Sequence, residues 1–452
     1  MDKHRLSVLT LNCWQFPHQQ RLSIVLRGLN IVSRERQRRL AAIGDYIAAC
    51  DADIVGLQEI WMWSDWEYIQ RVASERFGHV QLYYSGTLGA GLGILSKYPI
   101  VSTHYHRYSQ GGLPLKILHG DFYVGKGVAC ATIRHPAVLI DVYNTHLHAG
   151  YGPGLNRYEG HKFAEGWELA RLLRQSIAAG HHTIALGDFN VTPTSHVYQL
   201  LTQHACMTDS WLDVHQANLP RGVDPANPAI CTPEQAIDIF GITCDSPHNS
   251  WSKRTHLKQE PTNAELGDRL DYIFYFKSSL VCQDSRVVMT ESIPNTTHSY
   301  SDHFGVQSTF TFSSSKPQPA LTDPLDTRLT SLFLSEALDV IVYHQEAAMS
   351  QSLRYCVLCG ISGILAITCY LASVVLVALL ARLHHPTVVL PITTTVFGLC
   401  AMVLSATCIV MLVAGFVCGW NDDRCYRNVK AEMSRLSTLL SSSSNGSHTH
   451  TD

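Results

Sequence analysis

Two long stretches near the C-terminal end of this 452-residue chain contain no charged side chain. One runs from Tyr355 to Ala381 and the other from Leu383 to Trp420, and neither contains Asp, Glu, Lys or Arg. Each exceeds the roughly 20 residues that an α-helix needs to cross a bilayer. A core helix of a soluble protein normally keeps a polar face over such a length. The sequence therefore predicts two transmembrane helices, 354–382 and 386–420.

The residues that flank these helices indicate how the chain is oriented in a membrane. The turn Ala381–Pro386 is short, so the two helices should form a hairpin. Arg354 precedes the hairpin, and Arg424, Arg427 and Lys430 follow it. Because positive charges are enriched on the cytosolic side of a membrane, both flanks are expected in the cytosol. The N-terminus shows no signal-peptide pattern, so a cytosolic N-terminal region on the endoplasmic reticulum or another internal membrane is expected.

The rest of the chain divides by composition. Residues 1–312 alternate apolar and polar segments, as a folded domain does. The stretch "SSSKPQPALTDP", 313–324, has the composition of a linker, and residues 325–350 show helical apolar spacing that is typical of an interfacial helix. We therefore predict a linker with an interfacial helix over 313–353. The cytosolic tail, 421–452, ends in "SSSSNGSHTHTD" and is expected to be disordered there.

Charge and cysteine usage argue against several classes of protein. The formal net charge of −3 argues against a nucleic-acid partner, because binding to a phosphate backbone usually needs a basic face. Of 14 cysteines, seven lie between Cys356 and Cys425, and the others are scattered without paired spacing. This distribution indicates neither a disulfide framework nor a zinc site of clustered Cys and His ligands.

Within residues 1–312, short runs of strand type recur between helical patterns at 34–49, 66–77 and 162–177. This alternation predicts an α/β fold, in which sheets are covered on the outside by helices. Polar side chains stand where the runs end or begin: Asn12, Glu59, Asn144, His146, Asp188, Asn190, Asp271, Asp302 and His303. If the strand ends of two packed sheets meet at one rim, these residues converge on one site.

The chemistry that such a set can perform is narrow. Glu59 and Asn12 offer oxygen ligands to a hard divalent cation, Mg²⁺ or Mn²⁺. A histidine held by a carboxylate, His303 with Asp271, can act as a general base. A second histidine, His146, can donate hydrogen bonds to the charge that develops on a reacting phosphate. Together these groups predict attack by water on a phosphodiester.

The motifs at these positions resemble a known family. In chain order they are "LNCW", "LQEIW", "NTHLHA", "GDFN", "RLDYIF" and "SDHF". They resemble the endonuclease/exonuclease/phosphatase superfamily, which implies the deoxyribonuclease I-like four-layer α/β sandwich over residues 1–312. The stretches "HGDFYVGKGV", 119–128, and "NTHLHA" resemble more narrowly the neutral sphingomyelinases, whose magnesium-dependent members carry a C-terminal pair of membrane helices. The resemblance implies hydrolysis of sphingomyelin to ceramide and phosphocholine, and of choline lysophospholipids such as lyso-platelet-activating factor.

The resemblance also implies roles for single residues at the metal and the base. Glu59 is the expected principal magnesium ligand, with Asn12 as its neighbour. His303 is the expected general base, which Asp271 orients, and Asp302 supports the site.

Further roles concern the substrate. Asp188 and Asn190 are expected to orient the attacking water and the phosphate. His146 is expected to stabilise the transition state or the leaving group. Asn144 and Lys126 are expected to bind the substrate, the lysine because a lysine among glycines can approach a phosphate.

Other interpretations remain open at this point. Each residue alone has a structural explanation, since an asparagine often ends a strand and a histidine is often hydrogen-bonded in a core. A phosphoinositide phosphatase or a nuclease on the same fold would carry a similar catalytic set. A catalytically silent membrane scaffold is the third possibility, and magnesium-dependent turnover of a phosphodiester would exclude it.

Overall fold

The computed structural model describes residues 4–14, 34–151, 158–252, 261–313, 327–382 and 389–446. The chain divides into two compact units, one of Met1–Leu334 with Leu439–Asp452 and one of Ser335–Thr438. The described strands all belong to the first unit. Apart from Ser313, the predicted linker at 313–324 lies outside the described residues.

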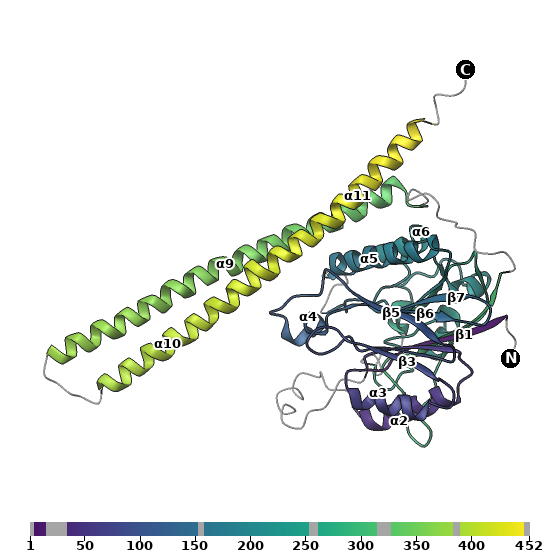
Figure 1. Ribbon diagram of the computed structural model, residues 1–452, viewed down its shortest axis with the longest axis horizontal. Helices are drawn as coiled ribbons and strands as arrows, with labels where there is room; N and C mark the ends of the chain where they lie inside the picture. The colour runs from purple at the N-terminus through teal and green to yellow at the C-terminus, as the bar shows by residue number, and fades with distance from the viewer. Residues whose placement is uncertain are drawn as a thin grey trace. The chain divides into compact units, whose positions relative to one another are not determined.

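The strands of the first unit form two six-stranded sheets (Figure 1). The strand order is β11-β12-β1-β2-β4-β3 in the first sheet and β5-β6-β7-β8-β10-β9 in the second. The bounds are β1 Arg5–Asn12, β2 Ile54–Gln58, β3 His79–Tyr83, β4 Leu92–Ser96, β5 Ile100–Arg107, β6 Gly127–Arg134, β7 Leu139–His146, β8 His182–Asp188, β9 Thr208–Asp209, β10 Asp271–Tyr275, β11 Leu280–Val288 and β12 Gly305–Phe312.

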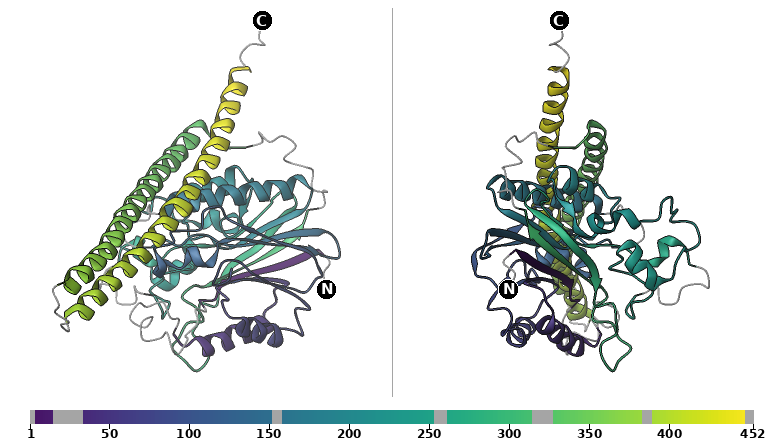
Figure 2. Two further views of the ribbon diagram at one scale, coloured as in Figure 1. Left: turned by 60° about the vertical axis from the view of Figure 1, so that its left-hand side comes forward. Right: turned by 90° about the vertical axis from the view of Figure 1, so that its right-hand side faces the viewer.

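Helices cover the outer face of each sheet (Figures 1 and 2). Helices α2 (Arg36–Ala49) and α3 (Trp63–Val72) pack on the first sheet, and α5 (Glu159–Ala178) and α6 (His196–Gln203) lie over the second. Shorter helices occupy the connections: η1 Ile117–His119, α4 Asp121–Val124, α7 Ser210–His215, η3 Gln216–Asn218, α8 Pro233–Phe240 and η4 Asn263–Leu266. The predicted four-layer α/β sandwich is confirmed.

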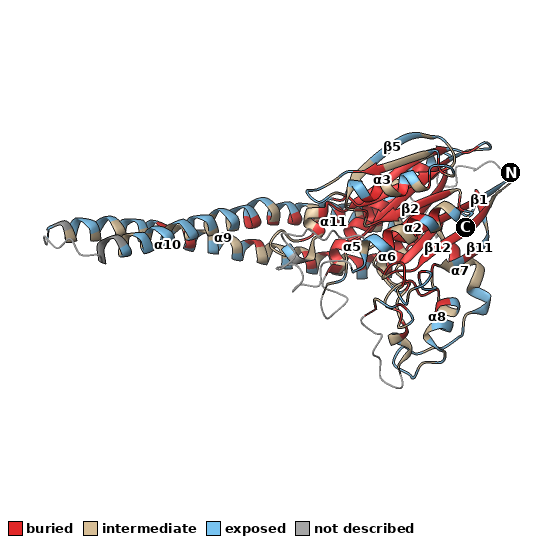
Figure 3. Ribbon diagram, turned by 90° about the horizontal axis from the view of Figure 1, so that it is seen from below, coloured by how far each residue is buried: buried red, intermediate tan, exposed pale blue. Residues whose placement is uncertain are grey.

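Strand β1 illustrates how the sequence specifies these layers. Leu6 and Val8 belong to the core between the two sheets, whereas Leu9 and Leu11 belong to the core beneath α2 and α3. Successive side chains of a strand point to opposite faces. A strand that is covered on both faces therefore needs apolar residues at its odd-numbered and at its even-numbered positions. The inner faces of the second sheet follow the same alternation, with Ile140, Val142, Ile184, Leu186 and Ile273 in the core between the sheets. Buried residues accordingly gather in the sheets (Figure 3).

A glycine lets the sheets approach each other. A Cβ atom added at Gly56 in β2 would lie 2.1 Å from Cδ1 of Leu186 in β8. A side chain at this position would force Leu186 to move, because such a distance is far inside van der Waals contact.

The strand directions bring particular ends together. Strand β1 runs parallel to β2, and β7 runs parallel to β8. Strands β12 and β10 run antiparallel to their neighbours β1 and β8. In each sheet the carboxyl ends of two parallel strands and the amino end of the antiparallel strand therefore lie at the same edge. These are the strand ends that carry the predicted polar residues.

The second unit is made of long helices. Helix α9 is Ser331–Arg382, and α10, Val389–Leu412, continues through a π-helical turn, Val413–Gly419, into α11, Trp420–Gly446. In the described part of the chain, two helices are long and apolar enough to cross a membrane, judged by length and composition alone. Ser352 in α9 donates a hydrogen bond from Oγ to the carbonyl oxygen of Gly415 at 2.7 Å, which ties the two helices together at the π-helical turn.

Two helix boundaries differ from the prediction. The interfacial helix expected at 325–350 is not a separate element, because α9 runs without a break from Ser331 to Arg382. No Gly or Pro occurs between 331 and 359, so nothing interrupts the helical hydrogen bonds. The serine-rich end of the tail was expected to be disordered, but α11 includes it as far as Gly446. Residues 447–452 lie outside the described part of the chain.

Candidate active site

Three predicted residues form a row across neighbouring strands of the second sheet. His146 at the end of β7 pairs with Asp188 at the end of β8, and Asp188 pairs with Asp271 at the start of β10. The side chains of all three residues point to the same face of their strands as the residues that form the core between the sheets. In the first sheet, Asn12 at the end of β1 pairs with Gln58 at the end of β2. The site therefore lies between the sheets at their common edge.

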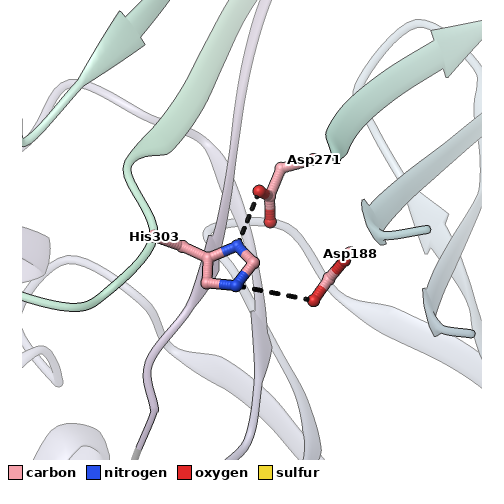
Figure 4. A group of neighbouring side chains, drawn as sticks. All are labelled: Asp188, Asp271 and His303. Carbon is pink, nitrogen blue, oxygen red and sulfur yellow. Dashed lines mark hydrogen bonds and ion pairs between the residues drawn. The ribbon is translucent and has the colours of Figure 1, made fainter. Parts of the chain in front are cut away.

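His303 completes this row from the segment before β12 (Figure 4). Its Nδ1 lies 2.8 Å from Asp271 Oδ2, and its Nε2 lies 3.9 Å from Asp188 Oδ2. The backbone N–H of His303 donates to Ser301 Oγ at 3.3 Å, and Ser301 Oγ donates to the Asn12 carbonyl at 2.6 Å. The segment that carries the histidine is thus tied to the end of β1.

The neighbours of His303 favour its protonated form. Burial opposes charge on the ring, but Cys244, Asp271 and Asp188 raise the pKa of His303 well above its ordinary value. Burial also raises the pKa of the Cys244 thiol to about 12, so this thiol is neutral near pH 7. The two carboxylates therefore supply the attraction, and Cys244 Sγ is a neutral neighbour 3.4 Å from Nε2.

Asn12 links two carboxylates from opposite sheets. Its Nδ2 donates to Glu59 Oε1 at 3.2 Å and to Asp188 Oδ2 at 3.0 Å. Burial, followed by the charge of Asp302, raises the pKa of Glu59 to about 7. Burial, opposed by His303, raises the pKa of Asp188 to about 6. Glu59 also has a left-handed backbone, with φ of 61°, a conformation that is uncommon outside glycine and concentrates at functional sites.

This donor set fits a hard divalent cation. Burial raises the pKa of Asp302 as well, so Glu59, Asp188 and Asp302 all resist ionisation in the absence of a cation. Carboxylate and amide oxygens are the ligands that Mg²⁺ prefers, and its charge would relieve that resistance. Among the described residues, Asp188, Asp271 and His303 also offer ligand atoms within 4.8 Å of one another. However, the hydrogen bond of His303 to Asp271 leaves that second set less free to bind an ion.

His146, at one end of the row, is neutral. Burial, with Lys126 and His303 adding to it, lowers the pKa of His146 well below its ordinary value. Its Nε2 lies 3.4 Å from Asp188 Oδ2, and no described residue is hydrogen-bonded to its Nδ1. A neutral imidazole keeps one N–H donor and one acceptor. His146 can therefore donate a hydrogen bond to a phosphate oxygen at this place.

Asn190 and Lys126 meet at one backbone carbonyl beside the row. Asn190 Nδ2 and Lys126 Nζ both donate to the Leu147 carbonyl oxygen, each at 3.1 Å. The backbone N–H of Asn190 donates to Asp188 Oδ1 at 2.9 Å. Lys126 is 3% exposed and forms an ion pair with Asp121 Oδ1 at 3.0 Å. The lysine thus lies behind the site, and the predicted direct contact with substrate does not fit this burial.

The structure places Asn144 away from any surface that a substrate could reach. Its Oδ1 accepts a hydrogen bond from Gln58 Nε2 at 2.7 Å, and its Nδ2 donates to the carbonyls of Leu57 and Gly93 at 3.0 Å. The side chain is fully buried between the sheets. The predicted substrate-binding role of Asn144 is corrected accordingly: this residue joins the sheets below the site.

Sequence reasoning missed residues that carry no recognisable motif. Arg39 in α2 is fully buried, and its guanidinium donates to the carbonyls of Cys13, Trp14 and Tyr300. It thereby joins the loop after Asn12 to the segment before Asp302. In the sequence it stands in "RERQRRL", which is typical of an exposed helix face. Cys244 next to His303 was likewise unpredictable, because a single cysteine has no spacing to interpret.

The sequence was compared with those of known protein families and of curated relatives. Residues 9–303 match the Endonuclease/Exonuclease/phosphatase family, and the chain belongs to this family. The predicted family is confirmed, and so is the predicted class of enzyme, a phosphoric diester hydrolase.

Among its relatives is the inositol phosphosphingolipids phospholipase C of Schizosaccharomyces pombe, which is 35% identical over 336 residues, 74% of this chain and 74% of the relative. The sphingomyelin phosphodiesterase 2 of Mus musculus is 27% identical over 316 residues, 70% of this chain and 67% of the relative. Among solved structures, sphingomyelinase C from Streptomyces griseocarneus matches with a TM-score of 0.45 and 17% identity, over 68% of this chain and 99% of that protein.

Proposed function

We propose that this chain hydrolyses sphingomyelin by the phospholipase C route, with Mg²⁺ as cofactor, and releases ceramide and phosphocholine. The observation that carries the proposal is the buried His303–Asp271 pair, which lies beside Asn12 and Glu59 at the rim where the two sheets meet. The names of the relatives, which refer to sphingomyelin and to inositol phosphosphingolipids, support a sphingolipid phosphodiester as the substrate. Choline lysophospholipids such as lyso-platelet-activating factor are included in the proposal.

In this proposal His303 removes the proton of the attacking water. Asp271 accepts a hydrogen bond from Nδ1, so the neutral ring keeps Nε2 as a proton acceptor. As the water oxygen bonds to phosphorus, one of its protons moves to Nε2, and the bond from phosphorus to the ceramide oxygen breaks. The leaving ceramide oxygen takes up a proton from solvent, and Nε2 later returns its proton to solvent. Asp271 stabilises the imidazolium that forms. Asp302 supports the site through its contact with Ser301.

Other residues act on the phosphate. His146 donates a hydrogen bond to the oxygen on which charge develops, a contribution that is large in a site shielded from water. Asp188 and Asn190 orient the water and the phosphate, and their mutual hydrogen bond keeps them in a fixed relation.

The proposed metal ligands are Glu59 and Asn12. A bound Mg²⁺ would withdraw charge from a phosphate oxygen. Mn²⁺ accepts the same oxygen donors, so both ions are expected to support activity.

A second candidate substrate differs only in its headgroup. The Schizosaccharomyces pombe relative is named for inositol phosphosphingolipids, and its identity to this chain exceeds that of the sphingomyelin phosphodiesterase from Mus musculus. The reaction at phosphorus is the same for both lipids. Phosphoinositide phosphatase and nuclease activities remain as alternatives on this fold.

The test is the release of the headgroup by the full chain in detergent. Sphingomyelin, inositol phosphoceramide, lyso-platelet-activating factor and phosphatidylcholine are compared with Mg²⁺ and with EDTA. His303→Ala should lower turnover by about two to four orders of magnitude. His181→Ala is the matched control, because its Nδ1 also lies 2.8 Å from a carboxylate, Asp141, but at the other end of β8. No Mg²⁺-dependent release from any lipid would refute the proposal and direct the assay to phosphoinositides and DNA.

We also propose a membrane placement. The apolar helices form a transmembrane hairpin over 354–382 and 386–420, with the catalytic domain, 1–312, and the tail, 421–452, in the cytosol. The membrane is the endoplasmic reticulum or another internal one. In sealed microsomes, protease added outside should remove tags at both ends of the chain, and protection of either tag would contradict this orientation.

A further inference from the structure

One peptide bond beside the site is held at both of its polar ends. The carbonyl of Leu147 accepts hydrogen bonds from Lys126 Nζ and Asn190 Nδ2, each at 3.1 Å. The N–H of the same peptide group belongs to His148, and it donates to Glu165 Oε2 at 2.8 Å. A carbonyl with two donors and an N–H with a carboxyl acceptor leave the peptide plane little freedom to rotate.

Glu165 has no role in the proposed chemistry, yet its burial is complete. It lies in α5 with an exposed fraction of 0%, and no described residue is hydrogen-bonded to its other oxygen, Oε1. Burial raises the pKa of Glu165 well above its ordinary value, so the site disfavours the charged form of this side chain. A buried polar group with a free oxygen is unfavourable for stability. The bond to His148 accounts for this unfavourable burial if it serves the site.

Helix α5 reaches Asn190 by a second contact. Lys162, one helical turn before Glu165, donates from Nζ to the Asn190 carbonyl at 2.9 Å. Asn190 has a left-handed backbone, with φ of 51°, so its conformation needs support from its surroundings. That support comes from Asp188, from Lys162 and from the Leu147 carbonyl.

We infer that Glu165 is a positioning residue: through the peptide bond between Leu147 and His148 it fixes the carbonyl that holds the Asn190 amide at the phosphodiester. This inference rests on the proposed function, in which Asn190 contacts the substrate. Glu165 itself touches neither the substrate nor the reacting atoms. What the contact requires is an acceptor for the His148 N–H, and a glutamine provides one.

The helix offers a matched control in Glu168. This residue is also buried, and its carboxylate accepts the Ser109 N–H at 3.1 Å and pairs with His106 at 2.6 Å. It supports a neighbouring loop without any contact to the peptide bond between Leu147 and His148. A purely structural effect of removing a buried carboxyl from α5 should therefore be shared by both positions.

The experiment is a double-mutant cycle in the full chain, with kcat and KM measured separately. Glu165→Ala should lower kcat about 10- to 100-fold with KM changed by less than about threefold, and Glu165→Gln should restore kcat to within about threefold of wild type. Adding Glu165→Ala to Asn190→Ala should cause little further loss, because both act through one amide. Losses that multiply, or an equal loss of kcat in Glu168→Ala, would overturn the inference.

Amide hydrogen exchange tests the geometry without turnover. In Glu165→Ala the His148 amide should exchange more than about 10-fold faster, and the segment around Asn190 should follow, whereas Glu168→Ala should accelerate exchange near Ser109 only. Unchanged exchange at His148 would refute the contact itself. A wild-type chain without phosphodiesterase activity would refute the proposed function and, with it, this role of Glu165. Multiplying losses in an active enzyme would refute the inference alone.

Discussion

Replacing Asp271 by asparagine tests the charge in the His303–Asp271 pair while keeping the shape of the side chain. Two unit charges at the observed separation of 2.8 Å attract by about 6 kcal/mol at an effective dielectric constant of about 20. Each 1.4 kcal/mol corresponds to about tenfold in rate, so loss of the full attraction corresponds to about 10⁴-fold. An asparagine amide can also donate to Nδ1, which would leave the proton on Nε2 and block its role as acceptor. We expect kcat to fall about 10³- to 10⁴-fold, with KM nearly unchanged.

The same substitution should change the pH dependence in a definite direction. The base must be neutral, and Asp271 raises the pKa of His303, so wild-type activity should rise as the pH increases through that raised value. Without the charge of Asp271, the pKa of His303 falls. The acidic limb of the kcat profile should then move to lower pH, although its plateau is much lower.

The assay is headgroup release at saturating lipid and Mg²⁺ over a range of pH, with Asp141→Asn as the control. Asp141 forms the equivalent 2.8 Å contact with His181 at the far end of the second sheet, so its loss tests for general damage. A kcat within tenfold of wild type for Asp271→Asn, or equal losses in both variants, would refute the reasoning.

Three further perturbations follow from the structure. Glu59→Gln should raise the Mg²⁺ concentration for half-maximal activity at least about tenfold, whereas Glu75→Gln, an exposed control, should not; equal metal titrations would remove Glu59 from the metal site. Asn144→Ala removes the acceptor that Gln58 Nε2 contacts at 2.7 Å and the Asn144 donor to the Leu57 and Gly93 carbonyls, so the free energy of unfolding should fall by about 1–3 kcal/mol; an unchanged melting temperature would show that these buried bonds do not contribute to stability. Gly56→Ala places a Cβ within 2.1 Å of Leu186 and should lower stability by about 1–3 kcal/mol; a melting temperature equal to that of wild type would show that the sheets can move apart.

Strand ends were the part of the fold that the sequence predicted best. The apolar runs that end at Asn12 and Asp188 became β1 and β8 with those residues as their last positions. Because successive side chains of a strand point to opposite faces, the pattern predicts that Asp188 and Asp271 both face the other sheet. His303 precedes β12, so its contact with Asp271 was predicted from the chemistry of a histidine held by a carboxylate and not from the strand pattern.

The distance of a residue from the rim of the sheets was harder to predict. Asn144 lies two positions before His146 on the same face of β7, yet it is sealed between the sheets while His146 borders the site. The alternation along a strand predicts the face to which a side chain points, but its distance from the rim depends on how the two sheets pack against each other. Arg39 was missed for a related reason, because only tertiary structure surrounds it with the carbonyls that satisfy its guanidinium.

The placement of the catalytic set on strand ends has a consequence for how this protein tolerates insertions and deletions. Deleting one residue inside β8 would rotate every later side chain of that strand to the opposite face and turn Asp188 towards the helices. The connection from η3 to β10, residues 219–270, has no such constraint on its length, although it carries Cys244 beside the base. We therefore expect length differences among relatives to accumulate in such connections, where headgroup preference can change while the spacing within β7, β8 and β10 stays fixed.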